Sequence, residues 1–207
     1  SNFTDFNPFE SIPGVSLRYV QHPSDLKQPD VIFLPGTKNT MDDLKWLRES
    51  GMEALILKAA ASGTLIFGIC GGYQMLGENL SDPHGVEAGG TMRGIGLLPV
   101  DTVFAEHKTR TQVCGKFLEL DEEFAPLKNI EFTGYEIHMG QTTWIKEVKE
   151  KELEYEPEQK KSGQTACEVV VTGKNPNVYG SYIHGLFDTG NIADRIVQAL
   201  AEKKGVA

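Results

Sequence analysis

The sequence predicts an α/β fold in which helices cover both faces of a mostly parallel sheet with an antiparallel extension. Two observations predict it. Early in the chain, short apolar runs alternate with amphipathic segments of helical length, which is typical of parallel sheets. In the middle, several strand-like runs follow one another without long helices between them. The 207 residues, 40% of them hydrophobic, suit one globular domain.

Two runs rich in β-branched and aromatic residues open this alternation. Val15–Val20 precedes a His-Pro-Ser turn at 22–24, and Val31–Leu34 precedes Pro35. We therefore expect both runs to be strands.

Two helices are expected next. Thr40–Ser50 has Thr40 as its N-cap and acidic residues in its first turn, and Gly51 ends it. Met52–Ala61 follows and ends at a Ser-Gly pair.

Further strands and a closing helix complete the predicted fold. The expected strands are Gly94–Phe104, Thr111–Leu120, Ile130–His138, Cys167–Val171 and Val178–Ile183. The helix is Ile192–Glu202, whose apolar residues share one face. Lys146–Ser162 is dense in lysine and glutamate, so we expect a solvated loop or an exposed hairpin there.

A cysteine between glycines, at the end of an apolar run, is the most informative feature of the chain. The predicted strand Thr64–Phe67 leads into GICGGYQMLG at 68–77, where Cys70 lies on a turn that only small neighbours permit. The backbone N–H groups that follow point at whatever the sulfur attacks, and a thiol there loses its proton more easily. Cys70 is therefore the candidate nucleophile of a covalent acyl transfer, whereas Cys114 and Cys167 are expected to be structural.

A cysteine nucleophile needs a base, and His184 is the strongest candidate among the five histidines. It follows an apolar run and precedes Gly185, which places it at a strand end, where sites form in such sheets. It also lies far from Cys70 in sequence, as the partners of a Cys–His pair usually do.

Acyl transfer also needs hydrogen-bond donors for the oxyanion that develops on the attacked carbonyl. Gly36 follows an apolar strand and can present its N–H, and Gly71 follows the nucleophile directly. One donor from each loop would form an oxyanion hole.

The composition argues against several classes of function. A net charge of −9 disfavours binding to nucleic acid or to an anionic membrane surface. No apolar stretch is long enough to span a bilayer, and the first residues are unlike a signal peptide. Three widely spaced cysteines suggest neither a disulfide framework nor a metal site, so a reducing cytoplasm is expected. There is no Gly-x-x-x-x-Gly-Lys phosphate-binding loop, and no cofactor is expected on this chain.

The cysteine and histidine segments together resemble the class I, triad-type glutamine amidotransferases. The residues concerned are GICGGYQ at 68–74 and YIHG at 182–185. Other stretches are similar to the amidotransferase domain of cobyric acid synthases, namely NFTDF at 2–6, LPGTKNT at 34–40, DLKWLR at 43–48, GIGLLP at 94–99 and GYEIHMG at 134–140. The resemblance covers nearly the whole chain.

The resemblance implies a flavodoxin-like three-layer sandwich and a glutaminase. Cys70 would attack the amide carbon of L-glutamine to form a thioester, His184 would move the proton, and Gly36 and Gly71 would stabilise the oxyanion. Gln74 matches a position that contacts the substrate in related glutaminases. Ammonia would pass to an ATP-dependent synthetase half, which carries ATP and Mg²⁺ and amidates the corrinoid adenosyl-cobyrinic acid a,c-diamide in cobalamin synthesis.

Two departures from the family pattern matter. Many triad amidotransferases have glutamate two residues after the histidine, where this chain has Leu186, and Asp188 or Glu136 could take its role. Glu136 and His138 share one face of an expected strand and could contact substrate, orient the site or be structural. The synthetase half is also missing from residues 1–207, which suggests the C-terminal amidotransferase domain of a larger enzyme.

Three alternatives stay open. The chain could be the glutaminase of a sister synthetase, such as cobyrinic acid a,c-diamide synthase or the enzyme of peptidoglycan precursor amidation. It could be a hydrolase of a related cysteine-elbow family that shows no preference for glutamine. It could also be a non-catalytic module that binds glutamine or docks onto the synthetase half, since the triad glutamate is absent.

Overall fold

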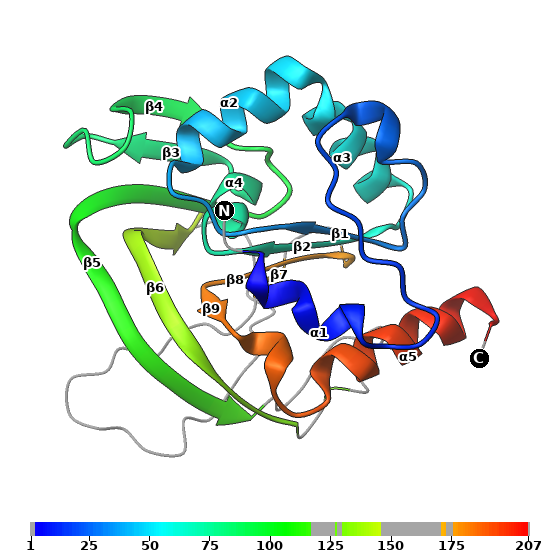
Figure 1. The fold of residues 1–207 in the computed structure, drawn as a ribbon. Coiled ribbons are helices and arrows are strands. Elements are labelled where there is room, and N and C mark those ends of the chain that lie inside the picture. Colours follow the sequence, from blue (N-terminus) through cyan, green and yellow to red (C-terminus); the bar gives the residue numbers. More distant parts are fainter. Residues whose placement is uncertain (1–2, 117–126, 128–129, 146–170, 173–175, 207) are drawn as a thin grey trace.

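The computed structural model describes residues 3–116, 127, 130–145, 171–172 and 176–206. Its first sheet has four strands in the order β1-β2-β8-β7, which are Val31–Leu34, Leu65–Ile69, Val178–Ser181 and Val171–Thr172 (Figure 1). β1, β2 and β8 run parallel, and β7 is antiparallel to β8. The predicted mostly parallel sheet is therefore confirmed.

Helices lie on both faces of this sheet (Figure 1). α2 (Thr40–Ser50) and α3 (Met52–Ala61) cover one face, and α1 (Asn7–Glu10) and α5 (Ile192–Lys204) cover the other. The three-layer α/β class is thereby confirmed. Within the described part of the chain, no helix is long and apolar enough to cross a lipid bilayer.

The antiparallel extension is a second sheet of five strands in the order β4-β3-β5-β6-β9. Its strands are Gly90–Arg93, Asn79–Asp82, Val100–Lys116, Glu131–Trp144 and Ile183–His184. Neighbours pair antiparallel except β3 and β5, and the long strands β5 and β6 form a curved ribbon beside the first sheet (Figure 1). Only Tyr182 separates β8 from β9, so the chain crosses between the sheets just before His184.

Alternate residues of β2 join two separate hydrophobic clusters, because they point to opposite faces of the first sheet. Ile66 packs in one cluster with Leu44 of α2. Phe67 packs in the other with Phe6 from the N-terminal segment and Ile196 from α5. Burial on both faces is the reason that β2 is a continuous apolar run.

The expected helices are present, with one correction at the start of α2. The N-cap is Asn39 rather than Thr40, because Asn39 Oδ1 accepts a hydrogen bond from the backbone N–H of Asp42 at 3.0 Å. Thr40 Oγ1 instead donates to Gln74 Oε1 at 3.1 Å. Gly51 ends α2 with a φ of +83°, which a residue without Cβ adopts readily.

The strand expected at Val15–Val20 is wrong. These residues pair with neither sheet, although Val15 and Leu17 pack against the second cluster. An apolar cavity of about 710 Å³, lined by residues 15–21 and 30–35, lies between them and β1. The run has the composition of a strand, but it pairs with no strand of the two described sheets.

The boundaries expected in the middle of the chain also change. One long strand, β5, includes parts of two expected strands, Gly94–Phe104 and Thr111–Leu120. Residues 94–98 are outside β5, and their backbone N–H groups donate hydrogen bonds to carbonyls at 75–78 around the end of helix α4 (Gly71–Leu76). β3 and β4 were not predicted, and β6 continues beyond His138. Residues 117–120, 146–162 and 167–170 of the expected elements lie outside the described residues.

We expect Asn39→Ala to lower the free energy of unfolding by about 1 kcal/mol, because the change removes the side chain that caps α2. Asn39→Ser is the matched control, since its hydroxyl accepts the same backbone N–H and should keep stability within about 0.5 kcal/mol of wild type. Urea unfolding followed by circular dichroism measures both variants. Equal stability of Asn39→Ala and wild type would contradict the assigned cap.

Candidate active site

Cys70 lies at the junction of β2 and α4, on the tight turn predicted from the sequence. Its backbone has a φ of +52° and a ψ of −111°, a conformation that residues with side chains rarely adopt. Such strain costs on the order of 1–3 kcal/mol and, at a strand-to-helix turn, is typical of a nucleophile elbow. The residue is buried, and its Sγ lies 3.4 Å from the carbonyl oxygen of Ile137 on β6.

The elbow forms because α4 packs backbone to backbone on the ends of β1 and β2. A Cβ on Gly72 would lie 2.0 Å from the Leu34 carbonyl oxygen, and one on Gly68 would lie 2.6 Å from the Gly72 carbonyl oxygen. Neither position has room for a side chain. These close approaches explain the glycines around Cys70 and set the direction in which the sulfur projects.

The structure brings Gly36 and His184 to the nucleophile. A Cβ built on Gly36 would lie 3.0 Å from His184 Cε1 and 3.5 Å from Cys70 Cβ. The loop after β1, the end of β2 and the end of β9 therefore meet at one point. The catalytic roles of Cys70 and His184 are consistent with this geometry and stay predictions until they are measured.

Asp5 supplies the orienting carboxylate that the sequence analysis did not find. His184 Nδ1 donates a hydrogen bond to Asp5 Oδ2 at 2.8 Å, and the backbone N–H of Gly185 donates to Asp5 Oδ1, also at 2.8 Å. Asp5 is buried in a short 3-10 turn, Thr4–Phe6. Cys70, His184 and Asp5 thus have the order of a Cys–His–carboxylate triad, in which the acid orients the ring.

Asp188 and Glu136 were the predicted candidates for the carboxylate that orients His184. This prediction is corrected, because Asp5 occupies that position. Glu136 bonds to His138 Nε2 at 2.7 Å, and Asp188 lies beside Gly185 in the turn after β9. Burial, together with the negative charge of Asp5, raises the pKa of Asp188. Asp5 was missed because 179 positions separate it from His184, and its only signal was its place in the NFTDF segment.

His184 holds its proton strongly. Burial disfavours the charged ring, but the hydrogen bonds to Asp5 and Cys70 and the negative charges of both partners outweigh it and raise the pKa of His184 to about 10. A ring with this pKa readily accepts the thiol proton and can later give it to a leaving group.

Two loops face each other beside Cys70 where an oxyanion hole is predicted. Gly71 is the first residue of α4, so its backbone N–H has no acceptor within the helix. A Cβ on Gly71 would lie 2.8 Å from Thr37 Oγ1, which is a buried polar atom without a hydrogen-bond partner within the described residues. Gly36 lies on the same loop as Thr37. Gly36 and Gly71 therefore lie on neighbouring loops, and the oxyanion hole formed by their N–H groups stays a prediction.

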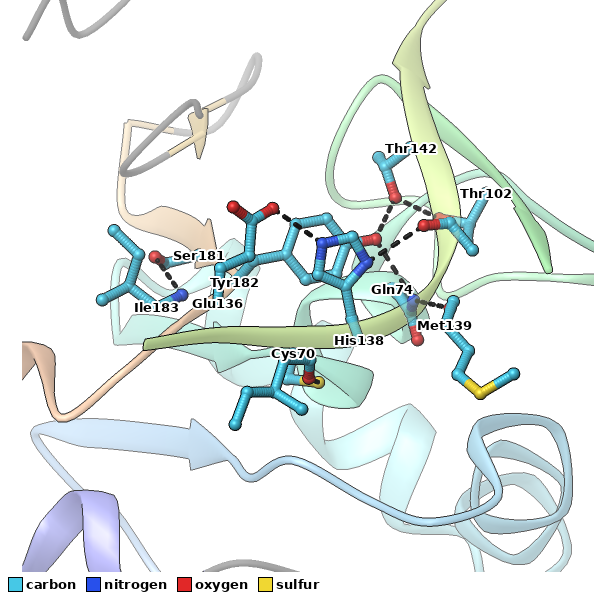
Figure 2. A network of polar contacts seen from close by, with 12 residues as sticks. Cys70, Gln74, Thr102, Glu136, His138, Met139, Thr142, Ser181, Tyr182 and Ile183 are labelled. Atoms are coloured by element: carbon cyan, nitrogen blue, oxygen red, sulfur yellow. Dashed lines mark hydrogen bonds and ion pairs between the residues drawn. The ribbon is translucent and has the colours of Figure 1, made fainter. Parts of the chain in front are cut away.

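Gln74 is buried in a polar network, which Figure 2 shows behind β6. Its Nε2 donates to the Met139 carbonyl and to the Tyr182 hydroxyl, each at 3.1 Å, and its Oε1 accepts from Thr40. Burial raises the pKa of Tyr182 well above its ordinary value, so this hydroxyl stays neutral. Since these bonds occupy the Gln74 amide, a direct contact with substrate stays a prediction.

Glu136 and His138 form a second polar group on β6, near Cys70 (Figure 2). The ring of His138 stacks on Tyr182 with centroids 3.7 Å apart. Among the residues that the structure describes, no group of three or more potential side-chain ligands is placed to hold a metal ion.

Comparison with known proteins decides the family. The model of the CobB/CobQ-like glutamine amidotransferase domain matches residues 1–192. The chain belongs to this family. Two similar proteins are named cobyric acid synthase. The one from Lachnoclostridium phytofermentans is 48% identical over the whole chain, and the one from Ruminiclostridium cellulolyticum is 49% identical. The chain spans only 40% and 39% of the lengths of these two relatives.

Solved structures agree on the amidotransferase fold. PurLQS from Thermotoga maritima matches with a TM-score of 0.66 and 21% identity, covering 96% of this chain and 91% of that one. A crystal structure titled as a glutamine amidotransferase matches with a TM-score of 0.62 and 18% identity, covering 100% and 95%. At these identities the likeness concerns the fold alone.

We expect Asp5→Asn to lower glutamine turnover on the order of 10²- to 10⁴-fold, because an amide no longer holds His184 in the required tautomer. Asp188→Asn is the matched control, since Asp188 lies beside the same turn without orienting the ring, and turnover should stay within about 3-fold. Steady-state release of glutamate measures both. Equal losses in the two variants would contradict the assignment of Asp5.

The raised pKa of His184 should make stability depend on pH. Its value is about 10 in the folded protein against an ordinary 6.5, so the charged ring stabilises the fold fully below pH 6.5 and this contribution disappears as the pH rises toward 10. Wild type should therefore lose its advantage in unfolding free energy over His184→Gln across this range. Urea unfolding at several pH values measures the difference, with His84→Gln on an exposed loop as the control. A difference that is constant with pH would contradict the raised pKa.

Proposed function

We propose that this chain is the glutaminase domain of a cobyric acid synthase. The Cys70–His184–Asp5 arrangement beside Gly36 and Gly71 carries the proposal, in a chain that is 48% identical to a protein of that name. The domain hydrolyses L-glutamine in the cytoplasm and passes ammonia to an ATP-dependent synthetase half. That half binds ATP and Mg²⁺ and amidates carboxylates of adenosyl-cobyrinic acid a,c-diamide.

The first half of the reaction forms a thioester. His184 takes the thiol proton, and Cys70 Sγ attacks the amide carbon of glutamine while the carbonyl electrons move onto oxygen. The N–H groups of Gly36 and Gly71 stabilise this oxyanion. When the intermediate collapses, the C–N bond breaks and the proton from His184 converts the leaving nitrogen into ammonia. Asp5 keeps the ring oriented by accepting from Nδ1, which leaves Nε2 for the proton transfers.

The second half of the reaction restores the enzyme. His184 takes a proton from water, whose oxygen attacks the thioester carbon and again places negative charge on the carbonyl oxygen. The C–S bond then breaks, glutamate leaves, and the sulfur regains the proton. The same ring and the same two donors serve both halves.

Two of the alternatives lose support. A non-catalytic module was suggested by Leu186, but Asp5 supplies the carboxylate that is absent at that position. A glutaminase of a sister synthetase would use the same chemistry with another acceptor of ammonia, and the names of the most similar relatives that we compared favour cobyric acid synthase.

Part of the proposal is that the domain works joined to further polypeptide, as the C-terminal part of a larger enzyme. Its relatives are about 2.5 times longer, since the chain spans 40% of one such relative. The apolar cavity beside β1 also supports contact with other protein. Phe3, Tyr19, Trp46 and Val206 line this cavity and are exposed, and exposed apolar groups gathered in one place favour association.

Intact-mass spectrometry after incubation with a glutamine-mimicking electrophile tests the proposed nucleophile. We expect one adduct on wild type, none on Cys70→Ser, and protection by L-glutamine. Cys114→Ser is the matched control, because Cys114 is exposed and lies outside the site, so its adduct should match that of wild type. The measurement is repeated with the synthetase half added. No glutamine-protected adduct in either condition would overturn the proposal.

A further inference from the structure

Glu136 and His138 form a hydrogen-bonded pair that the chemistry above does not use. His138 Nδ1 lies 3.0 Å from the Gly140 carbonyl oxygen, and Nε2 lies 2.7 Å from Glu136 Oε1. A carbonyl only accepts, so Nδ1 carries a hydrogen, and a second hydrogen must lie between Nε2 and the carboxyl group. His138 is buried and Glu136 is partly buried, and a hydrogen bond to a carboxyl group in such surroundings is stronger than one in water.

This pair clamps β6 where the strand is irregular. The β5–β6 pairing shifts register between Val103 and Lys108, and the opposite stretch of β6 includes Gly140, whose φ is +107°. The side-chain bonds run from position 136 through His138 to position 140, so they end at this irregularity. An irregular strand has fewer ladder bonds to fix its path, and here the side chains supply that constraint.

The clamped stretch is also the part of β6 that touches the catalytic elements. The Ile137 carbonyl oxygen lies 3.4 Å from Cys70 Sγ, and the Met139 carbonyl accepts from Gln74 Nε2 at 3.1 Å. Carbonyls two residues apart in a strand point to the same side, so both face the elbow and α4. Glu136 itself pairs with Ile183 in the β6–β9 ladder, next to His184.

The ring of His138 connects the clamp to the second catalytic strand. It stacks on Tyr182 with centroids 3.7 Å apart and planes at 15°. Tyr182 separates β8 from β9, and its hydroxyl bonds to Gln74 and Thr142. Movement of the His138 ring would therefore shift both the β6 backbone and Tyr182, which is two residues before His184.

We propose that Glu136 and His138 are a positioning pair for glutamine binding, which holds the β6 backbone at Ile137 and Met139 as one wall of the substrate site. This inference rests on the proposed glutaminase function. The pair acts through the strand, because His138 bonds to the Gly140 carbonyl and its ring stacks on Tyr182. Its loss should therefore weaken glutamine binding and leave the chemical step largely intact.

Glutamine kinetics of four variants test the proposal on the full chain, with the synthetase half present if turnover requires it. Glu136→Gln keeps the shape but removes the charge, and His138→Phe keeps the stack on Tyr182 but removes both ring hydrogen bonds. The double variant combines them. Glu131→Gln is the matched control, since Glu131 is an exposed glutamate on the same strand.

Each single variant disrupts the charged hydrogen bond between Glu136 and His138 and should raise KM for glutamine roughly 10-fold, with kcat within about 3-fold. The KM of the double variant should be no higher than that of the weaker-binding single variant. Two residues that act as one unit are already inactivated by either single change, so the second change adds nothing. Glu131→Gln should stay within about 2-fold of wild type. Thermal unfolding of every variant shows whether the fold is retained.

Three results would overturn the proposal. These are a fall in kcat with KM unchanged, single effects that multiply in the double variant, and KM values no different from that of Glu131→Gln. Failure of the proposed function gives a different result, in which wild type itself neither hydrolyses glutamine nor is protected by it from alkylation at Cys70. That result would overturn the glutaminase function and, with it, the positioning role that depends on this function.

Discussion

The close packing of α4 onto the ends of β1 and β2 is the constraint on which the rest of the site depends. Gly72 lies so near the Leu34 carbonyl, and Gly68 so near Gly72, that no Cβ fits at either position. Because the helix begins directly at the strand end, Cys70 must take a positive φ. The sulfur then projects to the point where the loop after β1 and the end of β9 meet, and every other group of the site is arranged around that position.

The second determinant is the crossing of the chain between the two sheets. β8 belongs to the parallel sheet beside β2, and β9 belongs to the antiparallel sheet beside β6, with Tyr182 as the residue between them. His184 therefore stands on one sheet and Cys70 on the end of the other. Buried hydrogen bonds of Tyr182 and Gln74 join the elements at this crossing, and Asp5 reaches it from the N-terminal segment. Such a site is sensitive to any shift of one sheet against the other.

Local patterns predicted much of the fold because their causes are local. The alternation of apolar runs with capped amphipathic helices indicated β1, β2, α2, α3 and α5, and Gly51 marked a helix end that needs a positive φ. The failures share a different cause. Val15–Val20 has the composition of a strand but finds no pairing partner, and residues 94–98 use their amides on the end of α4. Hydrogen-bond partners of a strand come from distant segments, so composition alone does not decide whether a run becomes one.

For the site, the sequence by itself predicted the reaction class and its main groups. A cysteine on a glycine-flanked turn after an apolar strand, a histidine at a later strand end and a Pro-Gly turn are each recognisable within a few residues. Only the tertiary structure decided which carboxylate orients His184. Asp5 lies 179 positions from His184 in sequence, and its Oδ2 lies 2.8 Å from His184 Nδ1, a contact that no local pattern encodes. The same holds for the Glu136–His138 pair, because its place against the elbow depends on how β6 crosses the ends of the parallel strands.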